Sequence, residues 1–569
     1  MCIRRTFSCA CGLLFILLGQ GCKKSEPGQS QSKMAPPNNE PVITLHWMGA
    51  KQVAAQPGAA GFLKIWRLPE TEKLRAQTLD KLALAPWTRG ATNQIAPMTN
   101  SAAMVRANPS AALLRPLLDD LVQQEFYLEL RDAGAAGCQL GLAIRLDAKR
   151  GSAWESNLAS LFESATANRR TPPQGTANGT TGWSVRATNS PAGLPPALRH
   201  TELVHAGDWT VFGLASDQNP IFKEILGRIQ ARQTPLAMSA SADWLQLRCD
   251  LRRLFSALSW GPALPADSPQ ISLAISGDGT NVLTRGQLTF AKPVPFEIEP
   301  WIIPTNLIHE PLHSFTAVQG LKAWVSSMPA WSDLRAGPAP NQLFCWGQGG
   351  SPFLDYAAAP LASAGSVMQK LGPKVAEETN PLLATNGMGK WERSSNSDGI
   401  AWNRVPIINP FIQSISQPQS PFLLAGLAPL VVTNSKPPLG TFQDLISRPN
   451  IVYFDRELTG PRVEAWMFLS QLFRIIGRRT QLQSETPTVQ WLKVVGPMLG
   501  ETLTAVVKTG PATLSFDRRS TFGLTGIEFH LLADWFESAR FPYETHMETA
   551  KLPPRRFGAK NNGASPGNK

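Results

Sequence analysis

The first half of the chain alternates between strand-like and helix-like hydrophobic patterns. Residues 125–130 and 138–146 alternate apolar with polar positions and carry β-branched or aromatic side chains, which predicts strands. Residues 152–168 repeat apolar residues every three or four positions, which predicts an amphipathic helix. A second helix is expected from Pro220, because Asn219 can cap it and proline is tolerated in a first turn. The pattern therefore predicts sheets packed by helices.

The second half presents the same order of elements, which suggests an internal duplication. Similar offsets between matching residues are what a duplication of about 210 residues would leave. We therefore predict an α+β fold of two similar units, residues 110–300 and 340–545, each a mostly antiparallel sheet packed by helices. The markers that recur in one order are Trp183 and Trp391, Gly213–Ala215 and Gly426–Ala428, and Asp250 and Asp455, at offsets of 208, 213 and 205 residues.

The length of the chain indicates several substructures. At 569 residues it exceeds the size at which a single hydrophobic core stops growing. Hairpins are predicted to close the two units, at 269–290 and 502–519. The remaining boundaries are predicted as a signal peptide at 1–21, a polar tether at 22–41, a strand and helix segment at 42–109, a connector at 301–339 and a basic tail at 546–569.

The first 22 residues have the pattern of a bacterial export signal. Arg4 and Arg5 precede an apolar stretch from Phe7 to Leu18, and small residues then lead to Cys22. The apolar stretch is about a dozen residues long, whereas a helix needs roughly 20 to span a bilayer. The segment is therefore predicted to direct export and not to span the membrane.

The end of this signal resembles the cleavage site of a bacterial lipoprotein, in which Cys22 would be diacylated and become the first mature residue. Gly19 departs from the pattern, because leucine is preferred three residues before the cysteine. Residues 23–41 are polar and rich in Pro, Ser and Gln, as a tether would be. Lys23 is not the aspartate that signals inner-membrane retention, which favours the outer membrane, facing the periplasm. The alternative is ordinary cleavage, which would release a soluble periplasmic protein.

Charge and cysteine usage add little specific chemistry. The net charge of +12 is dispersed, apart from the tail Lys551–Lys569, which has five basic residues and no acidic one. Without interleaved aromatic residues, this tail predicts a solvated terminus and no nucleic-acid partner. Outside the signal and Cys22, the widely spaced Cys138, Cys249 and Cys345 form neither a disulfide framework nor a C-x-x-C metal site. The expected partners are the membrane, through the N-terminal lipid, and an unidentified envelope component.

One stretch spells a metal-binding pattern. His309-Glu310-Pro311-Leu312-His313 matches H-E-x-x-H, in which a helix brings two imidazoles to one Zn²⁺ and the glutamate polarises the attacking water. Pro311 lacks an N–H and would cost about 3 kcal/mol inside a helix, which obstructs the motif. We therefore expect a loop that contains both histidines, beside a strand at residues 314–320. The alternative is a zinc-dependent hydrolase with His309 and His313 as ligands and Glu310 as general base.

Other signatures of catalysis are missing from the sequence. The letters G-x-S-x-G occur at Gly563–Gly567, but in the basic tail, where no strand and helix are predicted to form a nucleophile elbow. The sequence contains no phosphate-binding G-x-x-x-x-G-K-[ST] and no G-x-G-x-x-G after a strand. Paired acids at 119–120 and 377–378 fall in predicted helices, where adjacent residues do not face each other. No catalytic residue and no cofactor are therefore predicted, and the 17 tryptophans are expected to pack in the core.

Three segments carry a resemblance to a known family. Residues 299–320, 381–394 and 450–466 are similar to segments of large exported proteins, mostly lipoproteins, of verrucomicrobial-type bacteria. The resemblance implies an envelope location and supplies no catalytic residues. Together with the signal, it predicts a non-catalytic envelope lipoprotein with a binding or structural role.

Overall fold

The described part of the chain lies between residues 40 and 543. The predicted signal peptide, Cys22 and the basic tail at 546–569 lie outside the described residues. The computed structural model describes residues 40–543 except 89–100, 133–137, 167–180, 187–198, 237–242, 258–263, 266, 335–336, 350–353, 386–388, 395–397, 405–407, 431–434, 477–485 and 539–540.

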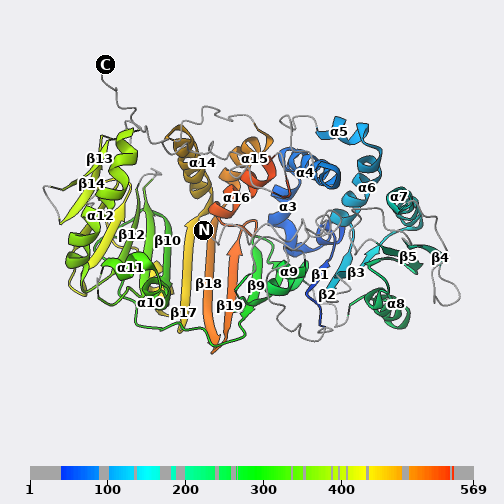
Figure 1. The fold of residues 1–569 in the computed structure, drawn as a ribbon, viewed down its shortest axis with the longest axis horizontal. Helices are drawn as coiled ribbons and strands as arrows, with labels where there is room; N and C mark the ends of the chain where they lie inside the picture. The colour runs from blue at the N-terminus through cyan, green and yellow to red at the C-terminus, as the bar shows by residue number, and fades with distance from the viewer. Residues whose placement is uncertain are drawn as a thin grey trace, which may run out of the picture.

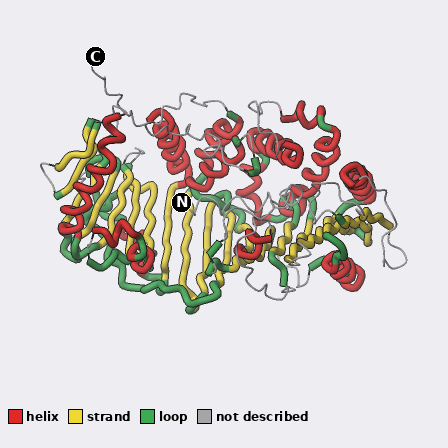
Figure 2. The backbone as a smooth tube through the Cα atoms, in the orientation of Figure 1, coloured by secondary structure: helices red, strands yellow, loops and turns green. Residues whose placement is uncertain are grey.

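In the described residues, nineteen strands form one antiparallel sheet that runs along the whole long axis of the molecule (Figures 1 and 2). At its centre β9 (Val282–Thr289) pairs with β19 (Thr513–Ser520). Outward from β9 follow β8 (Gln270–Gly277), β7 (Leu245–Asp250), β1 (Ile43–Trp47), β2 (Phe126–Asp132), β3 (Cys138–Arg145), β6 (Trp209–Ala215), β5 (His200–Ala206) and β4 (Thr181–Arg186). Outward from β19 follow β18 (Glu501–Gly510), β17 (Ile451–Leu458), β10 (Leu312–Gln319), β11 (Gln342–Gln348), β12 (Asp355–Pro360), β16 (Phe422–Gly426), β15 (Phe411–Ile415), β14 (Gly399–Asn403) and β13 (Lys390–Arg393).

The prediction of two similar α+β units, residues 110–300 and 340–545, is wrong. All eight residues of β9 pair with all eight of β19, so the sheet is continuous where the units were expected to separate. Trp183 lies on β4, the third strand beyond β3, whereas Trp391 lies on β13, the fourth strand beyond β12, so these markers are not equivalent. The strand order is the same on both sides of the β9–β19 pair as far as β4 and β14, but within one sheet.

The hairpins predicted at 269–290 and 502–519 are confirmed as β8–β9 and β18–β19. Each hairpin ends in a strand whose outer N–H and C=O groups need partners. The two outer strands, β9 and β19, supply those partners to each other. Their pairing places Arg285 directly opposite Asp517. The single sheet therefore results from an edge-to-edge match that the local patterns do not encode.

Helices cover parts of both faces, and several gather over one end of the central strands (Figure 1). The predicted cap of α8 is confirmed, because the Asn219 side chain accepts the N–H of Phe222 at 3.1 Å. Among the described residues, none of the helices is both long and apolar enough to cross a membrane. The helices are α2 (Ala50–Val53), α3 (Ala60–Trp66), α4 (Pro69–Thr88), α5 (Ser101–Ala107), α6 (Pro109–Gln123), α7 (Ala148–Thr166), α8 (Pro220–Arg232), α9 (Leu251–Ala257), α10 (Lys322–Ser326), α11 (Pro329–Leu334), α12 (Ala364–Thr385), α13 (Leu439–Ile446), α14 (Thr459–Ile476), α15 (Pro487–Val495) and α16 (Gly526–Glu537), with 3₁₀ turns at Pro57–Ala59 and Gly496–Met498.

The main apolar core changes face along the sheet. From β1 to β6 it lies beneath α4, α6 and α7, where Leu130 and Leu142 are fully buried. From β10 to β17 it lies on the opposite face, where Phe315, Phe344 and Phe454 pack beneath the 301–308 segment and α13. The strand register shows that Asp455, beside Phe454, points to the face that carries the first core. One face of the sheet is therefore apolar in one half and charged in the other.

We expect the second core to depend on Phe315. Its ring is 1% exposed and contacts the rings of Phe344, Phe442 and Phe454. Phe315→Ala should lower the free energy of unfolding by about 3–5 kcal/mol, because it leaves a cavity. Trp324, which is 59% exposed, gives the matched control, and Trp324→Ala should change the free energy by less than about 0.5 kcal/mol. Urea denaturation compares the two, and equal effects would contradict this assignment of the core.

Candidate functional site

The H-E-x-x-H stretch is not helical. His309, Glu310 and Pro311 precede β10, and His313 is the second residue of that strand. The Glu310 carboxylate accepts the backbone N–H of Leu312 at 2.9 Å. The zinc motif needs both histidines on one helical face, and Pro311 is incompatible with the interior of such a helix. Within the described residues, no three His, Cys, Asp or Glu side chains form a group that could hold a metal ion.

Backbone carbonyl groups hold both imidazoles in separate places. The Nδ1 and Nε2 atoms of His309 lie 3.0 and 3.1 Å from the carbonyl oxygens of Ser435 and Asn306. The Nδ1 atom of His313 lies 2.8 Å from the carbonyl oxygen of Gly349. Each ring thus contributes to the packing of a loop, and the two rings do not share a ligand position.

A more concentrated set of charged groups lies beneath α14 and α16, and we call it the β17 cluster. Its members are Asp455 and Glu457 of β17, Arg518 of β19, Arg462 of α14 and Glu528 of α16. Asp455 and Glu457 are two residues apart on one strand, so both point to the same face. They are only 6% and 5% exposed. Buried carboxylates need specific partners, because burial disfavours the charged form.

Asp455 is held from the neighbouring strand. It accepts a hydrogen bond of 2.6 Å from the Thr316 hydroxyl of β10. Burial raises the pKa of Asp455 above its ordinary value, while the Thr316 hydrogen bond and the positive charges of Arg518 and Arg462 act in the opposite direction. Asp455 therefore sits in a site that is polar but shielded from water.

Glu457 binds the start of α16. Its Oε1 accepts the N–H of Gly526, the first residue of that helix, at 2.6 Å. Burial raises the pKa of Glu457 from 4.5 to about 7, and the nearby Asp455 adds to the increase. The helix N-terminus favours the ionised form, because its free N–H groups carry partial positive charge. Glu457 therefore changes protonation near neutral pH while it joins a helix to the sheet.

Arg518 joins the same helix to the sheet from the other side. Its Nη1 and Nη2 atoms donate to the Glu528 carboxylate at 2.6 and 3.0 Å, and its Nε atom donates to the Thr504 hydroxyl at 3.0 Å. Glu528 also accepts the N–H of Thr525, which completes a capping box at the start of α16. The ion pair and the cap therefore fix the same end of α16.

A second ion pair borders the cluster on α14. Arg462 Nη1 donates to both oxygens of Asp355 at 2.8 and 3.1 Å, and His313 Nε2 lies 3.7 Å from Asp355 Oδ1. Gly347 lies beneath this contact, and a Cβ atom there would come within 2.2 Å of His313 Nε2. Glycine is therefore required where the histidine and the aspartate meet over the strand.

Cys345 has the wrong environment for a nucleophile. Its free thiol lies on β11 near Arg462 and Asp355, and burial raises its pKa to about 11. A reactive cysteine instead needs a lowered pKa, because the thiolate is the attacking species. The protonated thiol of Cys345 therefore acts as a small packing group.

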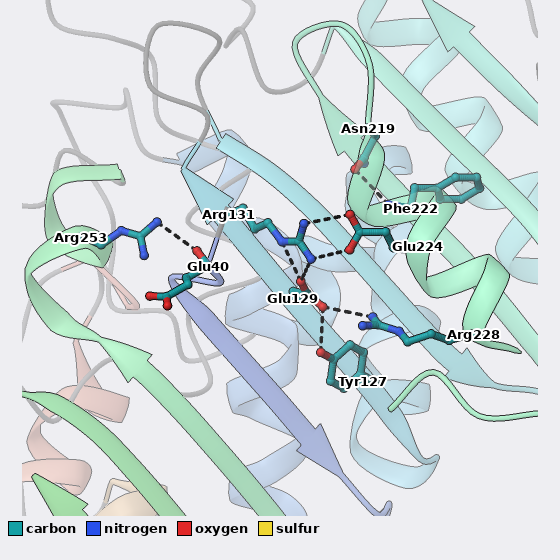
Figure 3. Close-up of polar contacts among 9 residues, drawn as sticks. All are labelled: Glu40, Tyr127, Glu129, Arg131, Asn219, Phe222, Glu224, Arg228 and Arg253. Carbon is teal, nitrogen blue, oxygen red and sulfur yellow. Dashed lines mark hydrogen bonds and ion pairs between the residues drawn. The ribbon is translucent and has the colours of Figure 1, made fainter. Parts of the chain in front are cut away.

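A second charged network fixes α8 to the other face of the sheet (Figure 3). Glu129 of β2 is 1% exposed and accepts hydrogen bonds from Tyr127 at 2.8 Å, Arg131 at 2.8 Å and Arg228 at 3.1 Å. Arg131 also donates to both oxygens of Glu224 on α8, at 3.0 and 2.6 Å. The two carboxylates and two guanidinium groups balance in charge. Because Glu224 and Arg228 lie on α8 and Glu129 and Arg131 on β2, the network joins this helix to this strand.

Sequence reasoning did not identify either charged network. In the strand 451–458, Tyr453, Asp455 and Glu457 occupy alternate positions, and apart from Arg456 the intervening residues are apolar, which is typical of a strand with one solvated face. The face is buried because α16, about 70 residues further along, packs over it. The i, i+2 acidic pair was the available signal, but its partners come from distant elements.

Comparisons with known proteins add no activity. No protein-family model matches the chain, and no curated protein matches it. Among solved structures, a chain from "Structure of crystal form III of TP0453" is similar at 11% identity, over 45% of this chain and 81% of that chain, with a TM-score of 0.23. A TM-score this low supports no conclusion about fold or function.

Glu457 should make stability depend on pH. Its pKa is raised from 4.5 to about 7 in the folded chain, so its contribution is fully present below pH 4.5 and is lost as pH rises through 7. Relative to Glu457→Gln, the wild type should lose up to about 3 kcal/mol of unfolding free energy between pH 4 and pH 8. Urea denaturation across this range measures the difference. Glu464→Gln, an exposed change on α14, is the control, and the same pH profile for both variants would refute the assignment.

The Glu129 network provides a matched pair of carboxylates on one arginine. Glu129 is 1% exposed and the side chain of Glu224 is 48% exposed, and both bind Arg131. Glu129→Ala should lower the free energy of unfolding by about 3–5 kcal/mol, because it removes the buried carboxylate that Arg228 and Tyr127 bind, while Arg131 keeps only Glu224. Glu224→Ala should cost less than about 1 kcal/mol, since its ion pair is screened by water. Thermal or urea unfolding compares the two, and a larger loss for Glu224→Ala would contradict the network's role.

Proposed function

We propose that this chain is a non-catalytic, lipid-anchored protein of the bacterial cell envelope, with a binding or structural role. The export signal and the lipoprotein-like site at Cys22 support the location. The resemblance to large exported lipoproteins supports the same placement. Lys23 after the cysteine favours the outer membrane, with the folded part in the periplasm.

The observation that carries the non-catalytic proposal is the use of the buried charged groups. Glu457 binds the first N–H of α16, Arg518 binds Glu528, and Glu129 binds Arg131 and Arg228. Each contact joins a helix to the sheet or aligns residues for such a join. A catalytic group must instead face a position where a substrate can reach it. The buried charges are therefore best explained as the means by which helices are fixed on a very wide sheet.

The zinc-hydrolase alternative gains no support from the geometry. Its two ligands, His309 and His313, lie on a loop and a strand, and the candidate base Glu310 accepts a backbone N–H. A fixed sheet with exposed loops suits a protein that presents surfaces to other envelope components. The proposed role is therefore interaction and not turnover.

Metabolic labelling tests the anchor. Cells that express the full chain are grown with a clickable palmitate analogue, and label is expected on the wild type because Cys22 would be diacylated. Cys22→Ala should abolish the label, whereas Cys345→Ala, a change of a partly buried thiol within β11, should retain it. An unlabelled wild-type protein recovered in the soluble periplasmic fraction would show that the lipoprotein proposal is wrong.

A further inference from the structure

One end of the central strands carries three exposed large apolar side chains, which we call the tryptophan edge: Ile298, Trp324 and Ile446. Their exposed fractions are 37%, 59% and 62%. Trp324 lies on α10, where the described residues are at least partly exposed, and Ile446 is the last residue of α13. Apolar surface of this kind is stabilised when an apolar partner removes it from water.

Hydrogen bonds bring these three segments to one place. Glu299 donates its N–H to Gln319 Oε1 at 3.0 Å, and Gln319 Nε2 donates to the carbonyl of Ile451 at 2.7 Å. The segment of Ile298 therefore lies beside the end of β10 and the start of β17. The helix α10 begins three residues after Gln319, and α13 ends five residues before Ile451. The tryptophan edge is thus built from three connectors at the same strand ends.

Basic side chains border the tryptophan edge. Lys508 donates to the carbonyl of Phe296 at 3.3 Å. The exposed Lys292 is two residues before Val294, whose N–H binds the carbonyl of Pro511 in the β18–β19 turn at 2.9 Å. Lysines beside exposed apolar groups are typical of surfaces that meet anionic headgroups.

Local acidic groups offset only part of this positive charge. Lys322 is neutralised by Glu297 at 2.7 Å. Glu299 and Asp444, which lies on α13, are further exposed acids. Lys292, Lys508 and Arg448, which follows α13 by two residues, exceed these two acids by one positive charge.

The described chain enters the sheet at the same strand ends. β1 begins at Ile43, and the register runs from Ile43 through β7, β8 and β9 to Leu514, the second residue of β19. Seventeen residues lie between Cys22 and Glu40, and this segment spans at most roughly 65 Å when fully extended. A lipid on Cys22 would therefore join the chain where it enters this end of the sheet, whereas α14, α15 and α16 gather over the opposite end (Figure 1).

We propose that the tryptophan edge rests on the bilayer surface, with Ile298, Trp324 and Ile446 in the interfacial region and Lys292 and Lys508 against anionic headgroups. This orientation rests on the lipid anchor proposed for Cys22. Tryptophan suits the interface because its ring is apolar while its N–H stays hydrated. Separate apolar side chains among lysines suit a lipid surface, whereas a protein partner would require a contiguous, closely packed core.

Quenching by lipid tests this contact in the full chain. The protein is reconstituted in phosphatidylethanolamine and phosphatidylglycerol vesicles with brominated acyl chains, which quench tryptophans that enter the bilayer. Trp324→Phe should remove most of the quenching. Trp87, which is 43% exposed on α4, gives the matched control, and Trp87→Phe should leave the quenching unchanged.

Vesicle binding by a chain that cannot be lipidated separates the surface from the anchor. In the full-length Cys22→Ala chain, Trp324→Ala should weaken binding to the same vesicles about tenfold relative to Trp87→Ala. If this chain shows quenching that depends on Trp324 while the wild type carries no palmitate label, the surface stands and the anchor is wrong.

Two outcomes would overturn the surface proposal. If the wild type carries label but Trp324→Phe leaves the quenching unchanged, the anchor stands and the tryptophan edge does not meet the bilayer. If Trp324 is shielded from an aqueous quencher by another protein and not by lipid, the edge is a protein interface instead. Unchanged urea denaturation of Trp324→Ala would show that neither result reflects unfolding.

Discussion

The backbone pairing of β9 with β19 is the interaction on which the rest of the structure depends. Each strand ends a hairpin and would otherwise present a row of unpaired N–H and C=O groups. Their eight-residue register joins nine strands on one side to ten on the other. The hairpins β8–β9 and β18–β19 therefore lie in the middle of the sheet, and α14 and α16 can pack beside α3 and α4 over its centre (Figure 1).

A continuous sheet also explains why charged groups are buried. The apolar core lies on one face between β1 and β6 and on the other between β10 and β17. Where α14 and α16 cover the face opposite the second core, they meet Asp455, Glu457 and Arg518. The helices remain bound there because these buried charged groups have hydrogen-bond or ion-pair partners. Removal of a partner would leave a buried charge uncompensated and would destabilise the fold. The raised pKa of Glu457 reflects the same effect, because burial disfavours its charged form.

The sequence predicted local structure better than it predicted arrangement. The hairpins, the Asn219 cap and a strand after Pro311 follow from turn residues, capping residues and alternation, which act over a few positions. The β9–β19 pair could not be predicted, because a single charge pair, Arg285 with Asp517, does not identify two strands more than 220 positions apart as neighbours. The contact of Glu457 with α16 was missed for the same reason, since Gly526 reaches the carboxylate only after that helix has docked. Repeated markers such as Trp183 and Trp391 indicated similar element order but not equivalent positions.

The long separation between β9 and β19 affects the order in which the sheet can form. The paired residues are more than 220 positions apart, so a chain that emerges N-terminus first during synthesis presents β9 well before β19 is available. Such an interval allows an open strand to join other molecules. Arg285 sits in the middle of β9 and is 70% exposed, and a charge at this position discourages association with a foreign strand. Asp517 lies directly opposite Arg285 in the complete sheet, and its negative charge attracts the positive charge of Arg285. Arg285 therefore disfavours pairing of β9 with a strand of another molecule and favours its pairing with β19.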